Sequence, residues 1–153
     1  MKVKNEKTFF VKNRKAYFNY EILEKYEAGI VLKGTEVKSI RAGNVSINES
    51  YAGIRDNEVF IYNMDISPYN YSGPFNHEPK RVRKLLLKKS EIKRLIGSTS
   101  EKGLTLIPIR LYFKNGLVIL EIGLARGKKL YDKRESIKKK MVEREISRAM
   151  RRR

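Results

Sequence analysis

The chain has 153 residues, which favours one domain with a core of its own. It contains no Cys and a single His, so disulfides, thiolate metal sites and histidine-rich metal sites are excluded, and no apolar stretch reaches the roughly 18 residues of a membrane span. With 35 Lys and Arg against 17 Asp and Glu, the formal net charge is +18, which favours nucleic acid as a partner over a membrane and, without cysteine, suits the reducing cytoplasm.

The N-terminal third of the chain predicts a long strand followed by a short helix. Residues 20–32 are rich in β-branched and aromatic side chains, which favours a strand, and Gly29 is expected to bend it. The stretch TEVKSIRAG then predicts a helix, with Thr35 as its N-cap, Glu36 in the first turn and Gly43 as its stop.

Two hairpins are predicted from their turn residues. The dipeptide Asp56-Asn57 joins apolar runs over 51–55 and 58–64, and Asn115-Gly116 joins runs over 104–113 and 117–125. Asn-Gly supplies the positive φ angles that a type I′ turn requires, so the second hairpin is the stronger prediction.

A second short helix is predicted between the hairpins, over SEIKRLIG. Ser90 is expected to cap it, Ile92, Leu95 and Ile96 to form its buried face, and Gly97 to end it. Antiparallel strands with short helices between them predict a mainly β fold, a small closed antiparallel barrel of the oligonucleotide-binding (OB) type.

The last 28 residues carry as much net charge as everything before them. Residues 126–153 hold 13 Lys and Arg against four Asp and Glu, a net +9, and residues 1–125 also carry +9. We therefore divide the chain into an RNA-binding barrel, 1–125, and a basic C-terminal tail, 126–153. A solvated tail that serves only solubility is an equally ordinary explanation of such a terminus.

The tail has a weak helical pattern. Asp132 followed by Glu135 resembles a capping box, and one narrow apolar face is formed by Val142, Ile146, Ala149 and Met150. Because the stripe is narrow and Lys138, Lys139 and Lys140 repel one another, we expect disorder in the free chain and a helix on a phosphate-rich surface.

A search for catalytic groups finds little. His77 lies in a loop without a nucleophile elbow nearby, so a loop hydrogen bond or a packing contact is expected of it. The stretch GSTSEKG places Lys102 before its last glycine, which is the wrong order for a phosphate-binding loop. The carboxylates of Glu24, Glu27 and Asp65 leave a metal-dependent RNA hydrolase as an alternative. A binding protein without enzymatic activity, metal or cofactor is favoured.

The signals for RNA binding are better. Residues 67–89 place Tyr69, Tyr71 and Phe75, which could stack on bases, ahead of a cluster of cations, Lys80, Arg81, Arg83, Lys84, Lys88 and Lys89. The tyrosines could equally plug the end of the barrel, whereas the cations are better explained by phosphates. Residues 11–18, VKNRKAYF, add a second basic patch.

Five motifs in order, YEAGIVLKGTEVKSIRAG, NMDISPY, PKRVRKLLLKKSEI, EKGLTLIPIRLYFKNG and GLARGKKLYDKR, resemble the SsrA-binding protein (small protein B) family over roughly residues 13–134. The resemblance implies a non-catalytic factor of bacterial trans-translation. Such a factor binds the tRNA-like part of transfer-messenger RNA and takes it to stalled ribosomes, where the tail fills the small-subunit decoding centre and the empty messenger channel as a helix. Elongation factor Tu and alanyl-tRNA synthetase act on the same RNA.

The resemblance also assigns site residues. The RNA-binding face is expected to include Asn13, Arg14, Lys15, Glu27, Leu86 and Lys88, beside the cations Lys80, Arg81, Arg83 and Lys84. Glu27 either accepts hydrogen bonds from RNA donors, orients a cation, or pairs with a neighbouring cation within the barrel. The segment expected to face ribosomal RNA comprises Gly127, Lys128, Lys129, Tyr131, Asp132, Lys133, Arg134, Lys138, Lys139 and Lys140.

Two positions depart from the family pattern. After NRKA the family continues with a basic residue and a histidine, whereas this chain has Tyr17 and Phe18, so a histidine hydrogen bond to RNA is lost and only stacking is retained. A ribosomal protein with a basic extension remains the alternative to the ribosome-rescue factor. A membrane-surface protein fits worst, because the apolar face of the tail is narrow and lacks Trp.

Overall fold

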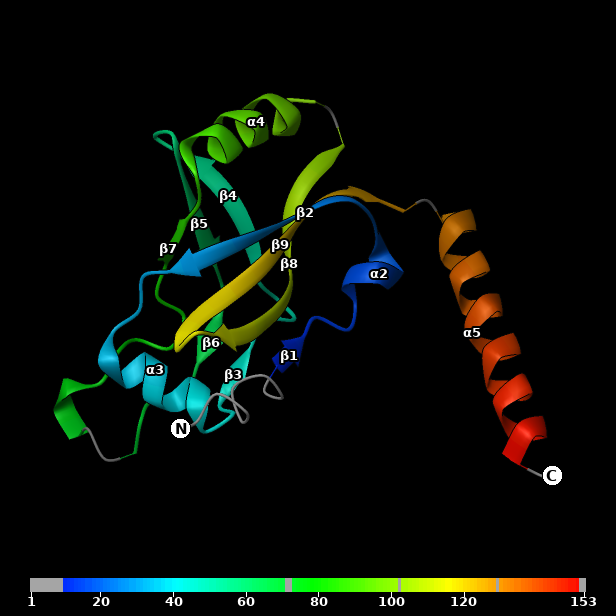
Figure 1. The fold of residues 1–153 in the computed structure, drawn as a ribbon, viewed down its shortest axis with the longest axis horizontal. Coiled ribbons are helices and arrows are strands. Elements are labelled where there is room, and N and C mark those ends of the chain that lie inside the picture. The colour runs from blue at the N-terminus through cyan, green and yellow to red at the C-terminus, as the bar shows by residue number, and fades with distance from the viewer. Residues whose placement is uncertain (1–9, 71–72, 102, 129, 152–153) are drawn as a thin grey trace.

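The fold is mainly β, and in the computed structural model its strands form a ring from which one long helix projects (Figure 1). The structure describes residues 10–70, 73–101, 103–128 and 130–151. In chain order the elements are β1 (Phe10–Lys12), α2 (Ala16–Asn19), β2 (Tyr20–Ile30), α3 (Gly34–Arg41), β3 (Val45–Ser46), β4 (Tyr51–Arg55), β5 (Glu58–Tyr62), β6 (Asp65–Ile66), the 3₁₀ turn η1 (Gly73–Phe75), β7 (Arg83–Leu86), α4 (Lys89–Thr99), β8 (Leu104–Lys114), β9 (Leu117–Gly127) and α5 (Leu130–Arg151).

The strands pair in the order β8-β4-β5-β7-β2-β9, and β9 pairs with β8 again, so the hydrogen-bonded order closes on itself. Every pairing in this ring is antiparallel, β1 adds to β8 on the outside, and β3 and β6 form a separate small sheet. Closure leaves few strand edges free for pairing with other chains. The predicted mainly β fold of antiparallel strands with short helices is confirmed.

Both predicted hairpins are confirmed by their turns. Asn115 and Gly116 have φ of 51° and 77°, and Asp56 and Asn57 have φ of 51° and 61°. Positive φ at both central residues matches the right-handed twist of the strands that they join. The long β8–β9 hairpin therefore follows from local sequence chemistry, and it forms one wall of the ring.

The bend predicted at Gly29 is wrong. The pairing of β2 with β9 runs without interruption through Gly29, and its register shifts instead between Ile22 and Glu24. Gly29 faces Leu86 of β7, since a Cβ atom there would lie 3.4 Å from the Leu86 Cβ. A small residue is needed at this position for the close approach of β7, which sequence alone does not distinguish from a bend.

Both helix starts were misplaced. The residues before α3 and α4 are Lys33 and Lys88, whose backbone N–H groups donate to the Glu36 carboxylate, at 2.7 Å, and to the Glu91 carboxylate. A glutamate three residues into a helix thus replaces the Thr35 and Ser90 caps that were predicted. Likewise Gly97 lies inside α4, which continues to Thr99.

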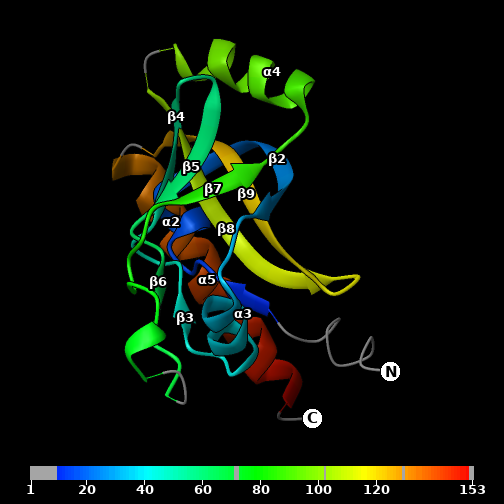
Figure 2. The ribbon, with the colours of Figure 1, turned by 90° about the vertical axis from the view of Figure 1, so that its left-hand side faces the viewer.

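The core fills the ring, and two helices cover its opposite ends (Figures 1 and 2). Helix α4 inserts Leu95 at one end, with Ile92 partly buried and Ile96 more exposed than predicted. Helix α3 contributes Ile40 near the β3–β6 pair at the other end. Fully buried apolar side chains inside the ring include Val59, Ile61, Leu85, Leu106, Leu111, Leu120 and Ile122.

Gly123 on β9 is the tightest glycine of the core. A Cβ at this position would lie 2.8 Å from Ile109 Cδ1 and 3.2 Å from Ile22 Cγ2. We expect Gly123→Ala to lower the free energy of unfolding by about 1–3 kcal/mol through overpacking, measured by urea denaturation. Gly97→Ala is the matched control, because a helical glycine with open space around it should become about 0.5–1 kcal/mol more stable as alanine. A neutral Gly123→Ala would show that β8 and β2 yield easily here.

The last strand and the tail meet close to the predicted boundary. Strand β9 continues to Gly127, two residues past Ala125, and α5 begins at Leu130, so Asp132 lies within the first turn of the helix and not before it. The described side chains over 137–150 are all exposed, including Val142, Ile146 and Met150, and the helix contacts the body through α2. Disorder of this segment in the free protein stays a prediction.

Candidate nucleic-acid interface

A basic turn between β1 and α2 is built around Asn13. Its backbone N–H donates to the Ile109 carbonyl at 2.8 Å, its Nδ2 donates to the Pro108 carbonyl at 2.9 Å, and its Oδ1 accepts from the Lys15 N–H. Asn13 is buried, whereas Arg14 and Lys15 are exposed. The amide therefore fixes the turn on β8 and presents the two cations to solvent, which is a positioning role for Asn13.

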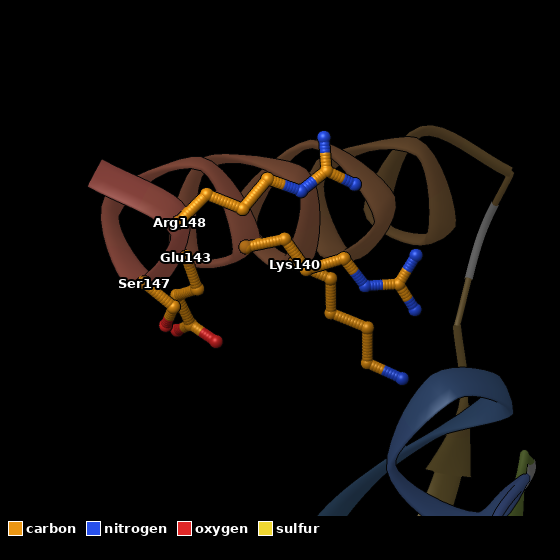
Figure 3. A pocket seen from close by; sticks show the side chains of 5 residues that line it. Lys140, Glu143, Ser147 and Arg148 are labelled. Carbon is orange, nitrogen blue, oxygen red and sulfur yellow. The ribbon is translucent and has the colours of Figure 1, made fainter. Parts of the chain in front are cut away.

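This turn borders a groove of about 510 Å³ that carries mostly positive charge. The tail helix takes part through Lys140, whose side chain extends from α5 toward the body (Figure 3). The residues lining the groove are Lys12, Asn13, Arg14, Tyr17, Lys25, Ile109, Arg110, Glu121 and Lys140. Five cations against one carboxylate make a site that attracts phosphate groups.

Aromatic rings accompany these cations. The Lys25 Nζ lies 5.5 Å from the ring centroid of Tyr17, and the Arg110 guanidinium lies 4.8 Å from that of Tyr112. Tyr17 also raises the pKa of Lys25, so this ammonium stays charged at neutral pH. Tyr17, one of the two departures from the family pattern, thus lies at the groove with half of its surface exposed, while Phe18 is partly buried.

Glu27 is already engaged by neighbours on β8. Its carboxylate accepts hydrogen bonds from the Tyr112 hydroxyl and from Lys114 Nζ, the latter at 3.4 Å. The bond from Tyr112 lowers the pKa of Glu27, which stays ionised. Burial first, and then Glu27, raise the pKa of Tyr112. The arrangement is that of a partner to a neighbouring cation, one of the roles considered from sequence, and an RNA contact by Glu27 stays a prediction.

The predicted cation cluster of residues 80–88 divides into buried and exposed members. Arg83 has no exposed side-chain surface, so it cannot reach a phosphate, and its assignment to the RNA-binding face conflicts with this position. Its Nε donates to Glu36 at 2.5 Å, its Nη1 to the Met64 carbonyl at 2.6 Å and its Nη2 to the Pro79 carbonyl at 3.0 Å.

Arg81 shares the same acid. Its Nη2 lies 2.6 Å from Glu36 Oε1, and the pair is partly exposed on the arginine side. Burial alone would raise the pKa of Glu36, but hydrogen bonds from Arg81, from the Lys33 N–H and from Arg83 outweigh it and lower the pKa. Glu36 therefore holds two arginines as an ion triad, which the sequence did not reveal because the partners are 45 and 47 residues away.

The remaining members of this segment face solvent. Lys84 lies 2.7 Å from Glu58 on the adjacent strand, and Leu86 is 52% exposed beside Gly29 of β2. Lys80, Lys88 and Lys89 are exposed. These side chains lie on the β7 side of β2, whereas the groove lies on its β9 side, so the structure separates them from the turn at Asn13.

The aromatic loop ahead of β7 is held by His77, as expected of a loop hydrogen bond. His77 is buried, with Nδ1 2.8 Å from Thr35 Oγ1 and Nε2 2.8 Å from the Ile66 carbonyl. Phe75 is 87% exposed, and the Tyr69 ring lies 5.4 Å from Lys38 Nζ, so neither plugs the ring of strands. Tyr71 lies outside the described residues.

The tail begins at an anchored residue. The Lys128 N–H donates to the Asn19 carbonyl at 2.9 Å, and its Nζ donates to the Tyr17 carbonyl at 2.7 Å, so α2 holds the base of the tail next to Gly127. Lys129 lies outside the described residues. Tyr131, Asp132 and Lys133 lie on α5, but their side chains are outside the described set, while those of Arg134, Lys138, Lys139 and Lys140 are exposed.

Helix α5 carries a further shallow basic surface of about 350 Å³ (Figure 3). It is lined by Lys140, Arg144 and Arg148, each one turn apart, together with Glu143 and Ser147. None of the helices in the described ranges is long and apolar enough to cross a membrane. Over the same ranges, no three His, Asp or Glu side chains gather closely enough to hold a metal ion.

Comparisons with known proteins agree with this picture. The family model described as SmpB protein matches residues 10–152. A protein named SsrA-binding protein from Carboxydothermus hydrogenoformans is 61% identical over 91% of this chain and 93% of its own length, and its namesake from Gloeobacter violaceus is 59% identical over 96% and 98%. A solved structure described as "tmRNA-SmpB: a journey to the center of the bacterial ribosome" is 51% identical, has a TM-score of 0.66, and is matched over 79% of this chain and 85% of that one.

Proposed function

Because the chain belongs to the SmpB protein family, we propose that it binds transfer-messenger RNA at the tRNA-like part and brings this RNA to stalled ribosomes for trans-translation. The observation that carries the proposal is the cationic groove, to which both the strand ring and the tail helix contribute. Phosphates of a folded RNA provide the complementary charge.

The two parts of the chain have different tasks in this proposal. The ring of strands, within 1–125, grips the RNA through the turn of Arg14 and Lys15, and the basic tail, 126–153, enters the vacant decoding centre and messenger channel. A channel that still holds messenger RNA excludes the tail both by volume and by phosphate repulsion. No covalent chemistry is required of this protein, which acts in the cytoplasm beside elongation factor Tu and alanyl-tRNA synthetase.

The test is a titration of the full chain against the tRNA-like fragment of transfer-messenger RNA and against an ordinary tRNA, over a salt series. We expect tighter binding to the fragment at every salt concentration, since contacts with phosphates alone do not discriminate between the two RNAs. Equal affinities for both RNAs would contradict the proposal.

One exposed cation of the groove should report its phosphate contact in the same titration. For Arg14→Ala we expect the slope of log K against log salt to become shallower by about 0.9, with weaker binding to both RNAs. Arg55→Ala is the matched control, because Arg55 is an exposed arginine at the far end of β4. Equal effects of the two substitutions would show that the groove has no special role.

A further inference from the structure

A second cavity adjoins the basic groove but differs from it in chemistry. Its volume is about 310 Å³, at the lower end of the range of small-ligand sites. Asn13 lines both hollows, so the cavity and the groove lie on two sides of the same turn. The full lining is Asn13, Lys15, Ala16, Asn19, Tyr20, Asn48, Glu49, Ser50, Tyr51, Thr105 and Ile107.

The lining has an apolar part, an aromatic part and a neutral polar part. Ala16 and Ile107 are buried and apolar, Tyr20 and Tyr51 supply two rings, and the other positions are mostly amides and hydroxyls. The one cation of the lining, Lys15, lies 3.5 Å from its one acid, Glu49, so these charges offset each other. Such a lining suits a flat neutral group with polar edges better than a phosphate.

Two amides in the lining are available to a ligand. The side chains of Asn19 and Asn48 form no hydrogen bond with any other described residue, whereas that of Asn13 is occupied by Pro108 and Lys15. An amide both donates and accepts, and each edge of a nucleobase presents donors and acceptors.

Tyr51 is placed to stack on such a base. It is 49% exposed, although its ring already stacks on Tyr62 with centroids 5.3 Å apart and an interplanar angle of 20°. One ring face thus packs on Tyr62 from the neighbouring strand, and a base against the other face would extend the stack to three rings. Gly53, the next outward-facing residue of β4, leaves room for Tyr62, because a Cβ there would lie 3.3 Å from its Cε2.

We propose that this cavity receives one unpaired nucleobase of the bound RNA, stacked on Tyr51 and hydrogen-bonded along its edge by Asn19 and Asn48. The inference rests on the proposed function, because the phosphates on either side of the base are held by Arg14 and Lys15. The turn at Asn13 separates the two tasks, with backbone phosphates on its groove side and a base on its cavity side. Base recognition of this kind supplies selectivity that phosphate contacts lack.

The test uses tryptophan, which this chain lacks entirely. In Tyr51→Trp, a single indole at the cavity keeps the stacking surface, and its fluorescence is followed while the full-length protein is saturated with the tRNA-like fragment. We expect strong quenching by the stacked base. Phe75→Trp is the matched control, because Phe75 is an exposed aromatic on η1 that does not line the cavity, and its emission should hardly change.

Affinities provide the second readout. We expect Tyr51→Ala to weaken binding of the fragment by about 5- to 150-fold with an unchanged salt slope, and Tyr51→Phe to bind like the wild type. Thermal denaturation of both variants establishes that they are folded at the temperature of the titration.

Each outcome separates this inference from the proposed function. If Tyr51→Trp is not quenched, or is quenched no more than Phe75→Trp, while the wild type still prefers the fragment, the base site is wrong and the proposed function stands. If the wild type shows no preference between the fragment and tRNA, the proposed function fails first. A loss in Tyr51→Ala that comes with a shallower salt slope would assign Tyr51 to phosphate binding and overturn the inference.

Discussion

A chain that ends at Lys128 is expected to keep its preference for the tRNA-like fragment of transfer-messenger RNA and to lose ribosome rescue completely. The end point matters, because β9 runs to Gly127 and Lys128 is hydrogen-bonded to α2. Ending at Ala125 would also remove the pairing of Arg126 and Gly127 with β2, which would confuse loss of the tail with damage to the ring.

The physical reason lies in where α5 lies. Its described side chains over 137–150 are exposed and pack on no part of the core, so removing them takes little from the stability of the body. The removed segment, 129–153, holds eleven Lys and Arg against four Asp and Glu. Binding to both RNAs should weaken and become less dependent on salt, whereas the ratio of the two affinities should persist.

Rescue is measured as tagging of nascent chains on ribosomes stalled at the end of a messenger without a stop codon, with transfer-messenger RNA charged and in excess. A matched control replaces Arg144 and Arg148 by lysine, which retains the charge of α5 and should retain tagging if charge alone is required. Undiminished tagging by the chain ending at Lys128 would refute the role of the tail. A truncated chain that no longer discriminates between the RNAs would place recognition in the tail.

Glu36→Ala is expected to destabilise the body by about 3–5 kcal/mol, the largest effect of any single substitution considered. Arg83 is fully buried, and the substitution leaves its charge without a partner in the interior. Burial lowers the pKa of Arg83, but the ordinary value is near 12.5, so the guanidinium stays charged at neutral pH. Urea denaturation followed by circular dichroism measures the loss.

The control for this substitution is Glu49→Ala. Glu49 also pairs with a cation, Lys15, but its side chain is 81% exposed and the ion pair spans 3.5 Å, so we expect a change within about 0.5 kcal/mol. A similarly small effect of Glu36→Ala would mean that water enters and solvates Arg83. Arg83→Met in the Glu36→Ala background should restore part of the stability, because it removes the unpaired charge.

The same carboxylate makes the fold sensitive to acid. The pKa of Glu36 is lower in the folded chain than its ordinary 4.5, so its contribution is complete above the unfolded pKa and is lost as pH falls through the folded pKa. We expect the difference in unfolding free energy between the wild type and Glu36→Gln to shrink below about pH 4.5 and to be constant near neutral pH. A difference that grows on acidification would reverse the assigned direction of the pKa shift.

Local chemistry made part of this structure predictable. Asn115-Gly116 requires no distant partner to turn the chain, and the apolar runs beside it form β8 and β9 as expected. The first helix was also located correctly, although its cap was assigned to Thr35 because hydroxyl residues are the commonest caps. The hydroxyl of Thr35 instead meets His77, 42 residues later, a contact that no local rule contains.

The site was less predictable for the same reason. Arg83 looks like any cation of a basic run until Glu36 arrives from another helix and buries it. The groove depends on α5 lying beside the turn of Arg14, which places Lys140 more than a hundred residues from its neighbours in the lining. The cavity at Tyr51 joins residues of α2, β4 and β8, and the only signal in the sequence was an aromatic residue on an outward strand position.

A lever arm is the mechanical description of α5. Its 22 residues, at about 1.5 Å each, make a rod of about 33 Å whose base is held at Lys128 by two hydrogen bonds to α2. A rotation of about 20° at that base moves the far tip by roughly 11 Å. Because α2 directly follows the turn of Arg14 and Lys15, a small adjustment of this turn on RNA would re-aim the far end of the chain by several times the original displacement.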